Sequence, residues 1–218
     1  MGNQSGGERT WGGSTLADRR ASRRASLLTA AERLAGDEGA AAVTVRSVCR
    51  RTRLTDRYFY ESFESRDALL LAAYERVATE ARDALTNAVA ATAPEPEARA
   101  RAAVAAFVAL VLDAPHKGRL LLIEPYADPV LGAHSHRLMP SFTELIDGQL
   151  ARGADDAGRR MTAYALVGGL ASLFAGWLRG SLEVTRERLV EHCVQLVLAA
   201  HEATTDEQQR RKRPHSGD

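Results

Sequence analysis

The sequence predicts an all-α protein, and three observations lead to this prediction. Apolar residues recur every three to four positions along most of the chain, as they do on the buried face of a helix. No stretch shows the alternation of apolar and polar residues that marks a half-buried strand. The 218 residues are 45% hydrophobic, which excludes global disorder and suits one small and one medium domain.

The first third of the chain divides into four expected helices with recognisable starts and stops. Gly39 is a natural stop for the first helix. Thr44, Thr55 and Ser65 can each cap the helix that follows, because a hydroxyl there accepts a hydrogen bond from a free N–H of the first turn. The apolar faces of the first and fourth helices consist of Leu27, Leu28, Ala31, Leu34 and Ala35, and of Leu69, Leu70, Ala73, Val77, Ala81, Ala84, Leu85 and Ala88.

The middle of the chain continues in helices broken by prolines. The Pro-containing run 93–97 predicts a loop, and the helix after it ends before Pro115. Asp128 and Pro129 mark a further helix start, with the acid at the cap and the proline in the first turn. Pro140 lies inside that helix and is expected to kink it or split it in two.

Two helices are expected at the C-terminal end. The segment 161–178 carries no charge and stops at Gly180, and a last helix covers 185–201. The uncharged segment has 18 residues, whereas a transmembrane helix needs about 20, and its many small residues lower its hydrophobicity. We therefore expect a helix buried on most sides in a soluble bundle, and no membrane partner.

Charge is divided unevenly, although the net charge is only +1. Residues 1–66 hold 12 Arg and 8 acids, whereas residues 67–218 hold 17 basic and 20 acidic residues. A basic end on a mildly acidic body suits a protein that touches phosphate with one end, and chance asymmetry is the alternative. Cys49 and Cys193 fall on apolar helix faces, which favours two small buried thiols over a disulfide.

No catalytic motif stands out in the sequence. There is no phosphate-binding glycine loop, no nucleophile elbow and no H-E-x-x-H zinc motif. His134 and His136 are two positions apart on an expected helix, so they do not face one ion. We therefore expect no enzyme activity, no metal and no cofactor.

The most informative stretch is Thr44–Leu70, TVRSVCRRTRLTDRYFYESFESRDALL. It contains a short helix, a tight connection and a second short helix rich in aromatic residues. Such a pair can lay its second helix in the major groove of DNA. Phe59 and Phe63 lie one turn apart and face inward, which leaves the other positions of the second helix for DNA.

This stretch closely resembles the DNA-binding region of TetR-family transcriptional regulators, whose pattern reads roughly T-V-R-D-I-A-x-x-A-G-V-S-x-x-x-L-Y-x-H-F-x-S-K-E-x-L. Arg53 stands where the family usually has Gly, at a cost of about 1 kcal/mol if the position needs a positive φ. Ser47 stands where the family commonly has an acid. The matching positions are Thr44, Val45, Arg46, Ser47, Val48, Cys49, Leu54, Thr55, Phe59, Tyr60, Phe63, Ser65, Arg66, Asp67 and Leu69.

The resemblance implies a set of DNA-contacting residues. The first residues of the second helix are those that reach base edges. Arg57 can pair with guanine, Tyr58 can pack on a thymine methyl, and Tyr60 matches a family tyrosine that commonly contacts phosphate. The whole expected set is Thr44, Arg46, Thr55, Asp56, Arg57, Tyr58, Tyr60, Ser62 and Arg66. Upstream, the repeat RRASRRAS at 19–26 can track phosphates or enter the minor groove, and a plain Arg-rich helix start is the alternative.

The resemblance also implies a domain order. Residues 1–18 are expected to be a flexible arm and residues 19–66 a helix-turn-helix DNA-binding domain. Residues 67–203 are expected to bind an effector and to dimerise, and residues 204–218 are expected to be a disordered tail.

Aromatic residues spread through the body predict a pocket for a small apolar or amphipathic effector, with ordinary core packing as the alternative. Its expected lining is Phe107, Glu124, Tyr126, Met139, Phe142, Tyr164 and Trp177. The last two helices carry long apolar faces with small residues, which can form a four-helix dimer interface or simply allow close packing within one chain. The expected interface residues are Leu170, Phe174, Leu189, Cys193, Leu196, Val197 and Ala200.

These expectations combine into one reading and two rivals. The reading is a bacterial, cytoplasmic, ligand-responsive repressor that binds a palindromic double-stranded DNA operator as a homodimer. One rival is an effector-independent activator or architectural protein. The other is a helical small-molecule binding module that has lost DNA binding, a reading supported by Arg53 and by the acids Asp56 and Glu61 near the groove.

Overall fold

The computed structural model of the chain describes residues 15–150 and 156–212, and these residues form helices and connecting loops without a strand. The elements are α1 (Leu16–Glu38), a short 3-10 turn η1 (Ala40–Ala42), α2 (Val45–Thr52), α3 (Asp56–Tyr60), α4 (Arg66–Ala90), α5 (Pro96–Val111), α6 (Pro115–Leu122), a second 3-10 turn η2 (Glu124–Tyr126), α7 (Pro129–Asp147), α8 (Asp156–Leu178) and α9 (Arg186–Lys212). The predicted all-α class is confirmed.

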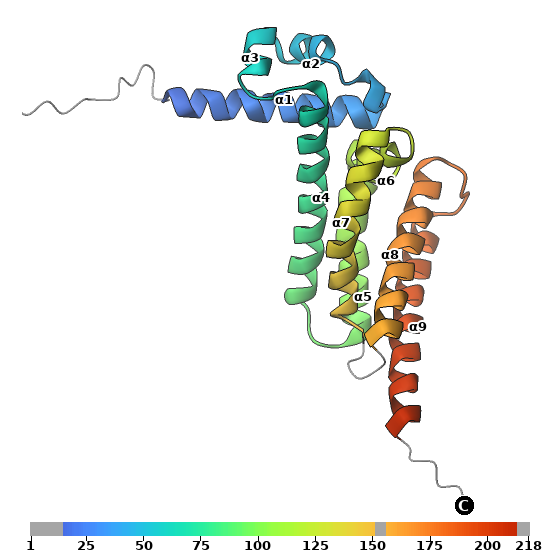
Figure 1. Cartoon of the computed structure of the whole chain (residues 1–218). Helices are drawn as coiled ribbons and strands as arrows, with labels where there is room; N and C mark the ends of the chain where they lie inside the picture. The colour runs from blue at the N-terminus through green and yellow to red at the C-terminus, as the bar shows by residue number, and fades with distance from the viewer. Residues whose placement is uncertain (1–14, 151–155, 213–218) are drawn as a thin grey trace, which may run out of the picture.

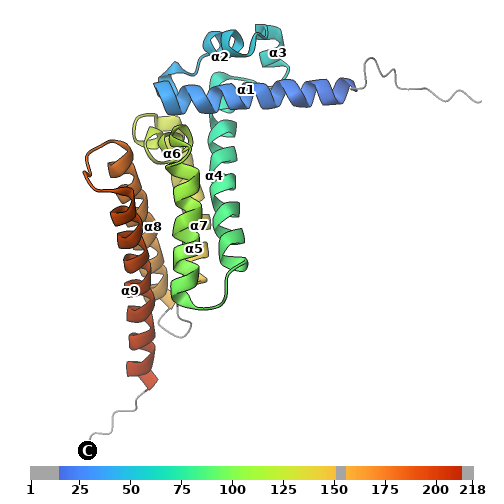
Figure 2. The same cartoon turned by 180° about the vertical axis from the view of Figure 1, so that it is seen from behind.

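The helices form a small N-terminal layer on one end of a longer bundle. Helix α1 lies across the end of the bundle, with α2 and α3 on its far side (Figure 1). Helix α4 leads from this layer into the bundle and packs beside α5 and α7, while α8 and α9 form the opposite edge (Figure 2). The predicted boundary between residues 66 and 67 falls at the start of α4.

Local capping explains where the N-terminal helices begin. Thr44 Oγ1 accepts from Ser47 N at 3.0 Å, and Ser47 Oγ accepts from Thr44 N at 2.9 Å, so the two residues form a capping box. Ser65 Oγ accepts from Ala68 N at 3.1 Å and caps α4. Thr55 occupies the cap position of α3 without a side-chain hydrogen bond, so its expected capping bond is not formed. The core beneath these helices includes Phe59, which is fully buried.

The turn between α2 and α3 places Arg53 in the left-handed region, with φ 57° and ψ 30°. Among the described residues it is the only non-glycine with a positive φ. The family's glycine is therefore replaced at a position where a Cβ is costly. Two hydrogen bonds at the end of α2 compensate for this cost. The backbone N–H groups of Arg53 and Leu54 both donate to Cys49 O.

Helix α7 shows which of the two expected effects of Pro140, a kink or a split, does not occur. The helix runs from Pro129 to Asp147 and is not split in two, although Pro140 lies inside it. Leu138 and Phe142, on either side of the proline, pack against the core and hold the segment helical. The start agrees with the sequence, because Asp128 Oδ1 accepts from the backbone N–H groups of Val130 and Leu131.

The last two helices also differ from expectation. Helix α8 is long and apolar enough to cross a membrane by length and composition, and only 17% of its most apolar window is buried. The expected helix buried on most sides is therefore wrong for a single chain, because α8 packs against α6, α7 and α9 but leaves Met161, Tyr164 and Ala165 exposed. Helix α9 continues to Lys212, nine residues past the predicted domain end at 203. Thr204 is buried and donates its hydroxyl proton towards His201 O at 2.8 Å, so the predicted disordered tail begins too early.

The N-terminal layer and the bundle meet in a tight junction between α1 and α6. A Cβ at Gly36 would lie 2.0 Å from His116 O, so these two backbones touch with no side chain between them. Glu32 is buried beside this contact, where it pairs with Arg76 of α4 and lies 3.4 Å from His116 Nε2. Three helices are thereby joined around one carboxylate.

A single substitution tests the strain at Arg53. We expect Arg53→Gly to raise the free energy of unfolding by about 1 kcal/mol, because glycine adopts this φ without a steric cost. Denaturant unfolding followed by circular dichroism measures the change. Arg50→Gly, one turn earlier inside α2, is the control and should lower stability by about 0.5–1 kcal/mol. A loss of stability in Arg53→Gly would contradict the account.

Candidate DNA-binding face and ligand cavity

The expected DNA-binding residues lie on one exposed end of the molecule. Thr44 and Arg46 are exposed at the start of α2, where free backbone N–H groups attract phosphate. Thr55, Asp56 and Arg57 are exposed at the start of α3, followed by Tyr58 and by Tyr60 at 59% exposure. Phe59 points the opposite way into the core, so α3 presents its polar face outward.

An acid on α3 is neutralised by arginines on both sides. Glu61 Oε1 accepts from Arg57 Nε at 3.1 Å, and Glu61 Oε2 lies 4.0 Å from Arg23 Nη2 of α1. The carboxylate therefore does not stand alone against DNA phosphate. Arg57 is 85% exposed and can exchange Glu61 for a base edge, because an exposed pair of this kind is weak.

The basic repeat in α1 partly packs on α3. The Arg23 guanidinium lies 4.5 Å from the centre of the Tyr58 ring, and that of Arg24 lies 4.1 Å from the centre of the Phe63 ring. Arg24 Nη1 also donates to Ser62 O at 2.9 Å. These arginines hold α1 against the end of α3, and they place positive charge beside the exposed face of the helix.

Two expected contact residues are engaged within the chain. The Ser62 hydroxyl donates to Tyr58 O at 3.2 Å and is half-buried. Arg66 donates to Ala40 O at 2.6 Å and to Val43 O at 3.0 Å, and its Nη2 lies 3.2 Å from Asp128 Oδ2. Arg66 is therefore not presented to phosphate as expected; it ties α4 to η1 and to the start of α7.

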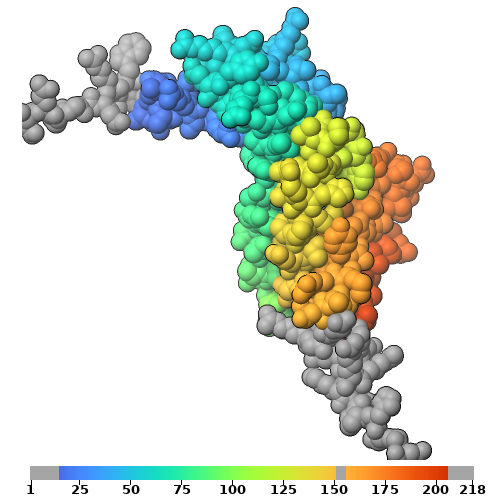
Figure 3. Space-filling view, viewed as in Figure 1, coloured from blue at the N-terminus to red at the C-terminus, as the bar shows by residue number. Residues whose placement is uncertain are grey.

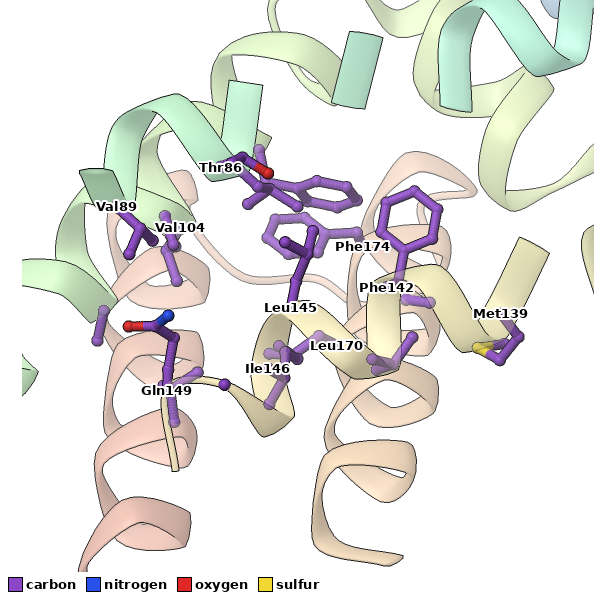
Figure 4. A pocket seen from close by; sticks show the side chains of 18 of the residues that line it. Thr86, Val89, Val104, Met139, Phe142, Leu145, Ile146, Gln149, Leu170 and Phe174 are labelled. Atoms are coloured by element: carbon purple, nitrogen blue, oxygen red, sulfur yellow. The ribbon is translucent and has the colours of Figure 1, made fainter. Parts of the chain in front are cut away.

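The bundle encloses a cavity of about 680 Å³ between α4, α5, α7, α8 and α9. Its walls are mainly apolar, and Figure 4 shows Phe142, Leu145, Leu170 and Phe174 directed into it. Phe107 and Phe174 meet edge to face with ring centres 5.1 Å apart. A space of this size and polarity suits a small apolar or amphipathic molecule.

The cavity gathers some of the expected effector residues and not others. Phe107, Tyr126, Met139 and Phe142 line it. The other three expected residues lie outside the cavity lining. Glu124 is buried at the junction, where its Oε2 accepts from Ala40 N at 2.6 Å. Tyr164 is 56% exposed on the outside of α8, and Trp177 Nε1 donates to Val184 O at 3.0 Å in the loop before α9.

Several polar lining residues were not expected from the sequence, among them Tyr74, Arg99, Gln149 and His201. Burial raises the pKa of Tyr74 to about 12, so its phenol stays neutral at physiological pH. Arg99 stands four positions before Ala103 and eight before Phe107, on the apolar face of α5, and that spacing was the available signal. Nothing in the sequence pattern places Gln149 or His201 at the same cavity.

Most of the expected dimer residues face into their own bundle. Leu170, Phe174 and Val197 line the cavity, and Leu189 and Cys193 are fully buried. The reason is that α8 and α9 use their most apolar faces to close the core. Leu196 and Ala200 are only partly buried. Both cysteines are free and buried, as expected, and burial raises the pKa of Cys193 to about 11.

The outer face of α8 remains uncovered and consists of small and apolar residues. Met161, Ala165, Gly169 and Ser172 are exposed along it at helical spacing. A Cβ at Gly168 or Gly169 would meet nothing within 4 Å. Close packing within the chain therefore does not account for these glycines. Figure 3 shows the α8 surface along the edge of the bundle, away from α4.

Comparison with known proteins adds a family match at the N-terminal end. Residues 27–73 match the model of the bacterial regulatory proteins of the tetR family. This range runs from the buried part of α1 through α2 and α3 into α4. Among the curated proteins, none matches the sequence significantly.

Solved structures share the fold at low sequence identity. The fatty acid degradation regulator FadR from Bacillus halodurans has a TM-score of 0.68 at 14% identity, over 81% of this chain and 94% of its own. FadR from Bacillus subtilis, in complex with stearoyl-CoA, has a TM-score of 0.68 at 12% identity, over 81% and 98%. SCO4454, a TetR-family regulator from Streptomyces coelicolor, has a TM-score of 0.64 at 21% identity, over 85% and 97%.

The matched range and the capped, exposed helix pair coincide, and the structural likeness extends the same fold through the bundle. Residues 27–73 thus form the DNA-binding domain of the tetR family, and the chain is a DNA-binding transcriptional regulator with the TetR-family fold.

Proposed function

We propose that the protein is a ligand-responsive repressor that binds a palindromic operator as a homodimer. The proposal rests on one observation, the presence of two connected features in the same chain. An exposed helix pair faces outward at one end, and a large apolar cavity lies in the bundle to which that end is locked. Such a protein acts in the cytoplasm, where its operator is.

Recognition of DNA is assigned to α3 and the start of α2. Arg57 leaves Glu61 and pairs with the edge of a guanine, which contributes about 1–3 kcal/mol of discrimination. Tyr60 and Arg46 bind backbone phosphates on either side and set the register. Arg23 and Arg24 add positive charge beside α3 without reading bases.

Three substitutions test this assignment on an operator selected from random DNA. We expect Tyr60→Phe and Arg46→Ala to weaken binding to all sequences, with Arg46→Ala also lowering the salt slope by about one. Arg57→Ala should instead relax specificity at one base position. Fluorescence anisotropy against salt concentration measures all three.

Arg101→Ala is the matched control, because this arginine is exposed on α5 of the bundle, outside the N-terminal layer. It should bind the operator as the unmodified protein does. If all three substituted proteins also bind unchanged, the assignment of the DNA-binding face is wrong.

The dimer interface is assigned to the outer face of α8 together with the partly buried Leu196 and Ala200 of α9. The face is apolar, uncharged from Met161 to Leu178, and open at Gly168 and Gly169. Paired with the same face of a second chain, it forms a four-helix contact. This pairing covers α8, and its two-fold symmetry matches that of an inverted repeat with one half-site for each α3 helix.

A charge placed on this face should separate the subunits. We expect Gly169→Glu to sediment as a monomer, because the carboxylate would be buried unpaired in the interface. The fold of each chain should survive, since a side chain at this position meets no neighbour within its own bundle. Asn87→Glu, exposed on α4 at the opposite edge, is the control and should remain a dimer. A dimeric Gly169→Glu protein would overturn this interface.

The effector is assigned to the cavity, and the bound stearoyl-CoA of the Bacillus subtilis neighbour supports a ligand with an apolar chain. Leu121 and Leu122 of α6 line the cavity, while Gly118 and His116 of the same helix lie at the junction side. A ligand that moves α6 therefore moves α1 and changes the spacing of the α3 helices. Operator binding that no ligand alters would favour the effector-independent activator or architectural reading instead.

A further inference from the structure

The cavity holds one unbalanced charge. Among the described residues that line it, Arg99 is the only Arg or Lys, and none is Asp or Glu. The other walls are mostly apolar side chains of α4, α5, α7, α8 and α9. An apolar enclosure stabilises a charge poorly, so a cation at this place calls for an anion.

The contacts of Arg99 leave part of its guanidinium unused. Its Nη1 donates to Gln149 Oε1 at 3.2 Å, whereas its Nε is buried and has no hydrogen-bond partner. Two acids that flank lining residues in the sequence are paired with other arginines. Glu97 pairs with Arg101 at 3.1 Å, and Asp147 pairs with Arg159 at 2.8 Å. Within the described part of the chain, no carboxylate lies at ion-pair distance from Arg99.

Gln149 holds this end of the cavity in place. Its side-chain oxygen accepts from Arg99, and its backbone oxygen lies 3.0 Å from His201 Nδ1, which must carry the proton because a carbonyl only accepts. The guanidinium is thus oriented by a neutral amide and not by a counter-charge. Figure 4 shows Gln149 on the opposite side of the cavity from Met139, with the apolar side chains between them.

We infer that the ligand of this cavity is an anionic amphiphile, a carboxylate on an apolar chain. The carboxylate binds the free edge of Arg99, and the chain lies along Phe107, Phe142 and Phe174 towards Met139. This inference rests on the proposed effector role of the cavity. It adds the charge of the head group and the end at which it binds.

The chemistry of the two groups matches. A guanidinium offers parallel N–H donors that fit the two oxygens of a carboxylate, and the bond is charge-assisted. The ligand supplies both missing elements at once, because its anion satisfies Nε and its chain fills the apolar volume. A neutral amphiphile of the same length fills the volume but leaves the cation unpaired.

Calorimetric titration of the full-length protein with laurate below its micelle concentration, and with dodecanol below its solubility limit, tests the head group. We expect laurate to bind at least about tenfold more tightly than dodecanol, since only laurate can pair with Arg99. Equal affinities, or binding of neither probe, would overturn the inference.

Two substituted proteins assign the effect to one residue. Arg99→Met keeps the aliphatic stem and removes the charge, so it should lose the preference for laurate while its dodecanol affinity stays within about twofold. Arg101→Met, two positions along the same helix but exposed, should bind both probes as the unmodified protein does. Laurate binding that survives in Arg99→Met would contradict the assignment.

The melting temperatures of the unliganded proteins distinguish a structural role of Arg99 from a role in ligand binding. Because Arg99 has no ion pair to lose, Arg99→Met without ligand should melt at the same temperature as the unmodified protein or higher. A marked drop would mean that Arg99 serves the fold. If dodecanol binds as tightly as laurate and releases operator DNA, the anion assignment fails while the proposed repressor function stands.

Discussion

The contact between α1 and α6 is the constraint on which the rest of the structure depends. At Gly36 the two backbones approach so closely that not even a methyl group fits between them. Side chains can adjust around a displaced helix, but two touching backbones cannot. Any movement of α6 along or towards α1 must therefore be passed to α1 as a whole.

Hydrogen bonds near this contact also tie η1 to the bundle. Glu124 receives the Ala40 N–H, and Arg66 binds Ala40 O, Val43 O and Asp128, so η1 is held from two sides. Glu124 is the first residue of the turn η2 and Asp128 caps α7 just after it, and η2 contributes Pro125 and Tyr126 to the cavity. The same short segment thus touches both the ligand space and the loop that precedes α2. A ligand that shifts η2 by a small amount shifts the start of α2 as well.

The sequence predicts well those features that depend on neighbours in the chain. Thr44, Ser65 and Asp128 cap their helices because capping needs only the next three residues. Arg53 adopts the positive φ that the family pattern implies, because the turn geometry is local. Phe59 is buried because helical spacing fixes its direction.

Features that depend on the packing of distant helices could not be predicted in the same way. Helix α7 is not split at Pro140 because Leu138 and Phe142 pack against the core. That packing energy comes from other helices, so the residues around the proline do not reveal it. Leu189 and Cys193 lie on the single apolar face of α9, whose opposite face is polar at Glu191, His192 and Gln195. Periodicity identifies that face, but only the three-dimensional arrangement shows that it closes the bundle and not a dimer. Arg66 and Glu124 are polar residues whose partners at the junction lie 23 or more positions away. Periodicity alone could not place them at the junction.

The central claim is that the cavity and the DNA-binding face are coupled through this junction. The most direct measurement is the affinity of the free protein and of its operator complex for laurate, with operator affinity measured with and without saturating laurate. Coupling requires that operator DNA lower laurate affinity by the same factor by which laurate lowers operator affinity. Identical laurate affinities in the free and operator-bound protein, despite binding of both, would contradict the account.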